Sequence, residues 1–297
     1  MTPREAGFLL LTSHLGNPDR KVLTAAQLRN LAQRVCGAER SSEVRELNLR
    51  DLQELGYDLH MAARILELLS EQALLEHYLH RAKKAGCVPV TRVSDGYPRL
   101  VRRRLGLDSP GCLWAKGDLS LLDAPKIALV GSRELAFDNR CFAAEAGYQA
   151  AKHGYVLVSG NAKGADRTAQ DACLLAGGGV ISVVADELET KFPRENTLYL
   201  SEDGFDLPFT PQRALSRNRV IHCLGSGVLV AQCSNGTGGT WDGTVKNLRF
   251  GWCRVCCYDD GSEGISRLVQ MGAEAVGLED LQKLSALEGE IHTLFDQ

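Results

Sequence analysis

One apolar run that ends in a glycine constrains the fold of this chain more than any other feature. The run covers residues 126–130 and breaks at Gly131 into the polar pair Ser132 and Arg133. A second apolar run, residues 155–158, follows one helix length later and ends in Ser159-Gly160. Apolar runs separated by single helical segments predict parallel strands joined by crossover helices. Ligands of such sheets bind where the carboxyl ends of strands meet the following helices.

The rest of the chain divides into three parts. Residues 1–90 have helical periodicity, at 23–35, 48–55 and 60–85 among others, and predict a small all-helical domain of the SAM or helix-hairpin-helix kind. Residues 91–125 are rich in turns and predict a connector with little regular structure. Residues 126–297 predict an extended Rossmann-like domain, an α/β fold with a doubly wound, mostly parallel sheet.

The expected elements of the Rossmann-like domain alternate. The expected strands are 126–130, 155–158, 180–185, 227–232 and 254–258. The expected helices are 138–153, 164–176, 211–224, 241–250 and 262–271, with a short helix after Gly277.

Composition excludes several classes of protein. No stretch approaches the roughly 20 apolar residues that span a bilayer, and the first residues lack the apolar core of a signal peptide, so we expect a cytoplasmic protein without membrane contact. A net charge of −3 excludes a generally basic nucleic-acid binder, although local charge decides phosphate binding. Cys253, Cys256 and Cys257 lack a second paired ligand set, so we expect buried thiols, no metal and no cofactor.

Three glycine-rich turns follow three of the expected strands, at 131–133, 159–166 and 234–240. Glycines allow close backbone approach, and each turn leads into a helix N-terminus whose partial positive charge favours phosphate. The turns match neither the G-x-G-x-x-G dinucleotide pattern nor a P-loop. Asp166, in the second turn, is expected either to cap its helix or to orient Arg133 or a ligand hydroxyl.

A triplet, Arg217, Asn218 and Arg219, lies on the expected helix 211–224. Guanidinium groups bind phosphate in a bidentate way, and an asparagine can hydrogen-bond a base edge or a sugar. The alternative is a set of surface ion pairs. Because apolar neighbours of the triplet must face the sheet, the two arginines cannot both lie on the core face.

Seven blocks stand in an order that resembles the DprA/Smf family of DNA-processing proteins. They are Tyr97-Pro98, the segment 113–117, Val-Gly-Ser-Arg at 130–133, Ser-Gly-x-Ala-x-Gly-x-Asp at 159–166, Phe-Pro-x-x-Asn at 192–196, Arg-Asn-Arg at 217–219, and 264–273. The resemblance implies a cytoplasmic homodimer that binds single-stranded DNA without turnover. It also implies a role in natural transformation and recombination, in which the protein protects incoming strands and helps load a RecA-type recombinase.

The resemblance assigns roles by motif position. It implies that Arg133 and the triplet 217–219 hold phosphates, and that the glycine-rich turns line the pocket through backbone N–H groups and small side chains. The whole expected DNA-binding set is Gly131, Ser132, Arg133, Ser159, Gly160, Lys163, Gly164, Asp166, Arg217, Asn218, Arg219, Gly238, Gly239 and Thr240.

The chain also departs from the family pattern. Ala214 stands where the family usually has a phenylalanine that could stack on a base, and Gln170 replaces a histidine. Phe209 or Trp241 could supply the missing ring. The chain ends at Gln297, where many members continue into a winged helix, so we expect a divergent member without that domain.

The departures leave a second hypothesis, a nucleotide-binding sensor or a nucleotide-processing protein of the wider superfamily. Related phosphoribohydrolases have a catalytic glutamate, but Gly243 stands at that position and Asp242 lies one residue early. We therefore predict no catalytic residue.

Overall fold

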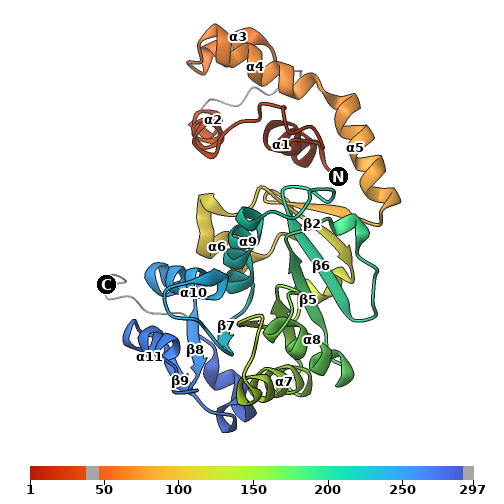
Figure 1. Cartoon of the computed structure of the whole chain (residues 1–297). Coiled ribbons are helices and arrows are strands. Elements are labelled where there is room, and N and C mark those ends of the chain that lie inside the picture. Colours follow the sequence, from red (N-terminus) through yellow and green to blue (C-terminus); the bar gives the residue numbers. More distant parts are fainter. Residues whose placement is uncertain (38–46, 290–297) are drawn as a thin grey trace.

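The structure is a computed structural model that describes residues 1–37 and 47–289. Within these residues, nine strands form one mostly parallel sheet with helices on both faces (Figure 1), which confirms the predicted α/β fold. Across the sheet the order is β1-β2-β6-β5-β4-β3-β7-β8-β9. The strands are β1 (Val88–Thr91), β2 (Cys112–Gly117), β3 (Lys126–Val130), β4 (Val156–Ser159), β5 (Val180–Val184), β6 (Thr197–Glu202), β7 (Gly227–Val230), β8 (Arg254–Tyr258) and β9 (Glu274–Val276).

The order in which successive strands are added to the sheet reverses at β3. Strand β3 pairs in parallel with β4 on one side and with β7 on the other, so the strands that follow β3 build the sheet first one way and then the other. Such a reversal opens a crevice outside the carboxyl ends of the strands. The predicted turns after β3 and β7 therefore flank the same crevice.

Helices cover the two faces of the sheet as separate layers (Figure 1). On one face, α7 (Phe137–Lys152) and α8 (Ala165–Leu175) bury an apolar cluster that includes Phe142 and Cys173. On the other, α6 (Arg99–Leu105), α9 (Pro211–Leu224), α10 (Gly238–Phe250) and α11 (Glu263–Gln270) pack on a second cluster. Each large apolar side chain buried this way contributes about 1.5–3 kcal/mol.

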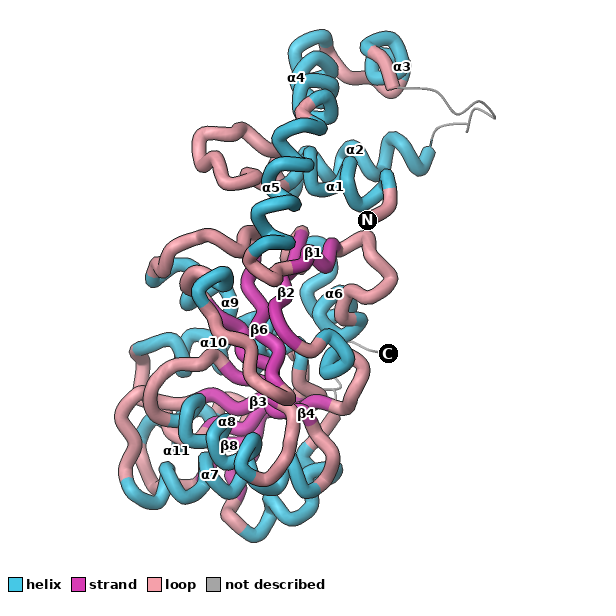
Figure 2. The backbone as a smooth tube through the Cα atoms, turned by 90° about the vertical axis from the view of Figure 1, so that its right-hand side faces the viewer, coloured by secondary structure: helices cyan, strands magenta, loops and turns pink. Residues whose placement is uncertain are grey.

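The N-terminal helices form a group at one end of the sheet, and α5 runs from this group down to β1 (Figure 2). A small core of leucines and Ile65 holds most of them together. A second cluster joins the group to the sheet, because the rings of Tyr78, Trp114 and Phe205 lie 4.8–5.4 Å apart. The helices are α1 (Pro3–Thr12), α2 (Ala25–Gly37), α3 (Leu49–Glu54), α4 (Leu59–Ser70) and α5 (Gln72–Lys84). The domain boundary near residue 90 stays a prediction.

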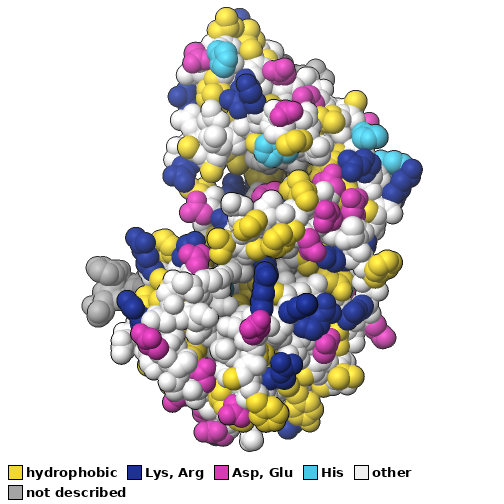
Figure 3. Space-filling model, in the orientation of Figure 1, with side chains coloured by type: hydrophobic (Ala, Val, Ile, Leu, Met, Phe, Trp, Pro, Cys, Tyr) yellow, Lys and Arg dark blue, Asp and Glu magenta, His cyan; other side chains and the backbone are white. Residues whose placement is uncertain are grey.

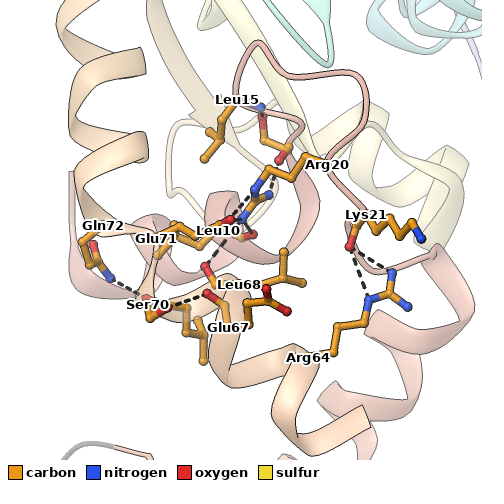
Figure 4. Close-up of polar contacts among 12 residues, drawn as sticks. Leu10, Leu15, Arg20, Lys21, Arg64, Glu67, Leu68, Ser70, Glu71 and Gln72 are labelled. Carbon is orange, nitrogen blue, oxygen red and sulfur yellow. Dashed lines mark hydrogen bonds and ion pairs between the residues drawn. The ribbon is translucent and has the colours of Figure 1, made fainter. Parts of the chain in front are cut away.

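A buried arginine explains why the helix predicted over 60–85 is in fact two helices. The chain leaves helical geometry at Glu71, whose ψ is 40°. There the Glu71 carboxylate accepts a hydrogen bond from Nε of Arg20 at 2.7 Å. The guanidinium of Arg20 also donates to the carbonyls of Ser13 and Leu10, and its side chain is only 3% exposed (Figure 4). This ion pair ties the loop after α1 to the break between α4 and α5.

The prediction of a connector with little regular structure over 91–125 is wrong. This segment contains β2, α6 and two 3-10 turns, η1 (Gly106–Asp108) and η2 (Leu119–Leu122), and β1 reaches Thr91. Strand β2 pairs antiparallel with both β1 and β6. Strands β6 and β9 were also not predicted. Paired residues of β2 and β6 lie up to about ninety positions apart in the chain, so no local sequence pattern predicts their pairing.

The C-terminal part of the described chain is irregular. The short helix expected after Gly277 is a 3-10 segment, η4 (Glu279–Leu287), and it is interrupted at Lys283. Its leucines 281, 284 and 287 are buried against the face that α7 covers. This segment therefore completes the core next to the amino ends of β7 and β8.

Candidate nucleic-acid interface

A pocket of about 750 Å³ opens at the carboxyl ends of β3 and β7, between the N-terminal parts of α9 and α10. Lys and Arg side chains gather in the middle of this face of the molecule, over the region between α10 and α8 (Figure 3). Nine of the predicted residues line the pocket, from all three turns and the triplet. They are Gly131, Ser132, Arg133, Asp166, Arg217, Asn218, Gly238, Gly239 and Thr240.

Arg217 projects from α9 into this pocket. A Cβ built on Gly160 would overlap the Arg217 guanidinium, so the guanidinium lies directly on the backbone of the second turn. Burial lowers the pKa of Arg217, while the neighbouring Asp166 opposes that shift. Arg217 is half-buried as a residue, but its Nε atom is buried without an acceptor, and its guanidinium makes no hydrogen bond with a described residue. A partly buried cation with unused donors is a site for an anion.

Asp166 closes the turn that it belongs to. The residue is 6% exposed, and its carboxylate accepts hydrogen bonds from the N–H groups of Gly160 and Ala162, both at 3.1 Å. Burial raises its pKa, against the opposing effects of Arg217 and of these two N–H groups. The backbone N–H of Gly160 is therefore already occupied and is not free for a ligand. The N–H of Ser132 is likewise used, by the carbonyl of Gln232 at 3.1 Å.

The free backbone donors come from the third turn. Helix α10 begins at Gly238, three residues before the predicted start, so the turn 238–240 is the first turn of a 13-residue helix. Thr237, the N-cap, makes no side-chain cap hydrogen bond. The first N–H groups of a helix have no intrahelical acceptor and attract anions. Asn218 Nδ2 donates to the carbonyl of Gly239 at 2.9 Å and so joins this turn to α9.

The other residues of the second turn support the pocket from behind or from its rim. Ser159 is buried, and its hydroxyl accepts a hydrogen bond from Gln170 Nε2 at 2.6 Å. Gly164 has a φ of 79°, and a Cβ there would overlap the carbonyls of Ser132 and Arg133. Lys163 is exposed. Gln170 also donates to Ser182 Oγ at 3.0 Å, so the residue that replaces the family's histidine connects β4 to β5.

Arg219 does not reach the pocket. It points to the other side of α9, where Nη2 lies 3.2 Å from Oε2 of the buried Glu202. Nη1 donates to the carbonyl of Asp108 at 2.5 Å. The triplet is thus divided, with Arg217 and Asn218 at the pocket and Arg219 in an ion pair.

Phe209 is not among the predicted site residues, although it is one of the two aromatic residues that could replace the phenylalanine missing at Ala214. Phe209 lines the pocket and is 52% exposed, near Ala214, which also lines it. Trp241, the other possibility, packs instead against the core cluster under α9 and α10. Phe209 precedes Arg217 by eight residues, so a search for the family spacing of three could not find it.

Neither a metal cluster nor a membrane-spanning helix occurs in the described part of the chain. Within 1–37 and 47–289, no three His, Cys, Asp or Glu side chains are placed to hold a metal ion. The described helices include none that is long and apolar enough to cross a membrane. Asp242, considered as a displaced catalytic acid, lies outside the pocket and pairs with Lys246 at 2.8 Å.

Comparison with known proteins identifies the family. The family model described as DNA recombination-mediator protein A matches residues 89–286, about two thirds of the chain. The chain belongs to this family. The match covers all the pocket residues and the antiparallel strands β2 and β6, and it confirms the resemblance to DprA/Smf proteins.

Relatives of the DNA recombination-mediator protein A family match this chain over part of their length. The DNA processing protein DprA of Streptococcus pneumoniae is 34% identical over 57% of this chain and 64% of its own length. DprA of Bacillus subtilis is 28% identical over 57% of this chain and 62% of its own length. The matched region thus spans less than two thirds of these relatives.

Solved structures of the same family share the fold. The X-ray structure of DprA from S. pneumoniae has a TM-score of 0.70 at 26% identity, covering 97% of this chain and 100% of that one. The N-terminal helices are therefore included in the likeness. DNA processing protein A from Helicobacter pylori has a TM-score of 0.55 at 23% identity, covering 67% of this chain and 93% of that one.

Proposed function

We propose that this protein is a DNA-processing protein that binds single-stranded DNA in the pocket between α9 and α10, without turnover. The observation that supports this most is Arg217, a half-buried residue whose Nε is buried without an acceptor among the described residues. A buried donor left unsatisfied is costly, so a ligand that satisfies the guanidinium gains affinity. A phosphate fits because its oxygens accept the paired N–H groups of a guanidinium.

Three groups converge on that phosphate position. Arg217 supplies charge from α9, Arg133 supplies it from the turn after β3, and the first turn of α10 supplies backbone N–H groups. The chain as a whole is acidic, so attraction to DNA is local to this pocket. Phe209 lies at the same pocket with half of its surface exposed, and we propose that a base stacks on it.

The remaining parts of the proposal come from the family. DNA processing protein A from H. pylori has a single-stranded DNA binding mode of its own. We propose that this chain acts likewise in natural transformation and recombination, as a cytoplasmic homodimer that helps load a RecA-type recombinase. No cofactor and no catalytic residue are part of the proposal. The pairing of Asp242 with Lys246 outside the pocket supports binding without hydrolysis.

The test is fluorescence anisotropy of a labelled oligo-dT at several salt concentrations, with the wild type and Arg217→Ala. Log affinity should fall linearly with log salt, because each neutralised phosphate releases counterions. Arg217→Ala should weaken binding at low salt by about tenfold or more, since hydrogen bonds to charged groups are worth about 1.5–3 kcal/mol. The salt slope should also fall by about 0.7, the value for one phosphate of a single strand.

Arg140→Ala is the matched control, because Arg140 is exposed on α7 and does not line the pocket. It should leave both affinity and slope unchanged. Equal binding by Arg217→Ala and wild type would exclude this pocket as the DNA site. Binding that a mononucleotide abolishes at low concentration would favour the nucleotide-sensor hypothesis instead.

A further inference from the structure

A second pocket, of about 640 Å³, lies on the opposite side of α9 from the first. It is formed by α6, α9 and the C-terminal part of α10. Basic and hydrophobic side chains lie next to each other at the left edge of Figure 3, over the end of α10. The residues used below are Arg104, Leu215, Arg219, Lys246, Phe250 and Trp252.

Two guanidinium groups of this pocket have unused donors. Arg104 Nη1 donates to the carbonyls of Cys223 and Gly225, but its Nε is buried without an acceptor. Arg219 pairs with Glu202, and its Nε is also buried without an acceptor. Lys246 adds a third cation at the rim, half exposed beside Asp242. Glu202 and Asp242 pair with two of these cations, and Asp108 also lines the pocket, so the attraction for an anionic ligand is local to the donors that these carboxylates leave unpaired.

The same pocket has an aromatic wall. The ring of Phe250 is 60% exposed and stacks on Trp252, with centroids 5.8 Å apart and planes at 16°. Burying such a ring under a flat ligand removes apolar surface from water. A nucleotide combines a flat base with a phosphate, which matches an aromatic wall beside three cations.

The second pocket borders the first. Leu215, on the exposed side of α9, lines both pockets. Residues of one helix alternate between them, since Arg217 and Asn218 face the first pocket while Ser216 and Arg219 face the second. A strand held at Arg217 can therefore pass over Leu215 into the second pocket.

We infer that the second pocket binds a further nucleotide of the single strand held at Arg217, with its base on Phe250 and its phosphate near Arg104, Arg219 and Lys246. The inference rests on the proposed function. The DNA site then consists of both pockets, and the affinity for DNA is predicted to depend on strand length. A strand too short to cross Leu215 uses only the first pocket.

The test compares the affinity of oligo-dT strands of about 4, 8, 12 and 16 nucleotides for wild type, Phe250→Ala and Arg217→Ala. The wild type should bind the long strands more tightly than the short ones. Phe250→Ala should bind the short strand as the wild type does and lose at least about fivefold on the long strands, the effect of one stacked base. Because Phe250 is exposed, its removal should leave the fold intact.

Phe192→Ala is the matched control, since Phe192 is 87% exposed and lines neither pocket. Lys246→Gln should reproduce the length-dependent loss without touching the aromatic wall. Equal affinity of Phe250→Ala and wild type at every length, or an equal loss at every length, would overturn the second pocket while leaving the first. If Arg217→Ala changes nothing at any length, the proposed function itself is wrong.

Discussion

Gly160 offers a way to disturb the DNA site without removing any charge. An alanine here adds one methyl group at a position that the Arg217 guanidinium occupies. The backbone at Gly160 is held by its hydrogen bond to Asp166, so the flexible arginine must move instead. We therefore expect Gly160→Ala to push the guanidinium out of its place beside Asp166 while the net charge of the protein stays the same.

The expected loss of DNA affinity equals the contribution of the contact between the Arg217 guanidinium and a phosphate. One hydrogen-bonded contact between a charged donor and a phosphate is worth about 1.5–3 kcal/mol, which corresponds to about 10- to 150-fold in affinity. Added volume in a packed site costs about 1–3 kcal/mol of folding stability, less if the arginine can swing into solvent. Anisotropy with oligo-dT measures the first quantity, and urea denaturation measures the second.

A double-mutant cycle decides whether the effect passes through Arg217. The variant with both Gly160→Ala and Arg217→Ala should bind no more weakly than Arg217→Ala alone, because residues that share one interaction are not additive. Gly96→Ala is the control, since nothing lies within 4 Å of a Cβ at Gly96. Wild-type affinity in a folded Gly160→Ala variant would refute the reasoning that this position of Arg217 is the one that binds DNA.

Two further predictions concern stability and affinity. Burial lowers the pKa of His222 from 6.5 to about 3, and Asn247 Nδ2 lies 3.1 Å from its Nδ1, so the folded protein holds this imidazole neutral. Because the unfolded chain protonates near pH 6.5, wild type should lose about 1.4 kcal/mol of stability per pH unit below that value, relative to His222→Gln, in urea denaturation. Ala214→Phe should tighten oligo-dT binding by up to about 1–3 kcal/mol, because Ala214 lines the pocket near Phe209 and a ring there can stack on a base. Unchanged or weaker binding of a folded Ala214→Phe would mean that bases do not lie at this wall.

The predicted strands and helices of the Rossmann-like part agree closely with the structure where the pattern is local. Strands β3, β4, β5 and β8 differ by at most one residue from their predicted ends, because parallel strands buried on both faces are short continuous apolar runs. Strands β1, β2, β6 and β9 were missed. Strand β2 joins the sheet only through antiparallel pairs with β1 and β6, and β6 follows a turn in which Asn196 has a φ of 53°.

Of the candidate site, the sequence determined the turns and the types of donor, because glycines and helix starts are encoded locally. It could not decide which donors are free. Asp166 occupies the N–H of Gly160 within its own turn, and the carbonyl of Gln232 occupies the N–H of Ser132, a competition that exists only when these two distant segments meet.

The tertiary structure also decided between the two arginines of the triplet. Residues two apart on an α-helix point about 200° away from each other, so a helix wedged between two pockets sends Arg217 into one and Arg219 into the other. The sequence predicted only that the two arginines cannot both lie on the core face, and both were expected to hold phosphates. Only the packing of α9 against β3, α6 and α10 assigned Arg217 to the turns after β3 and β7 and Arg219 to Glu202.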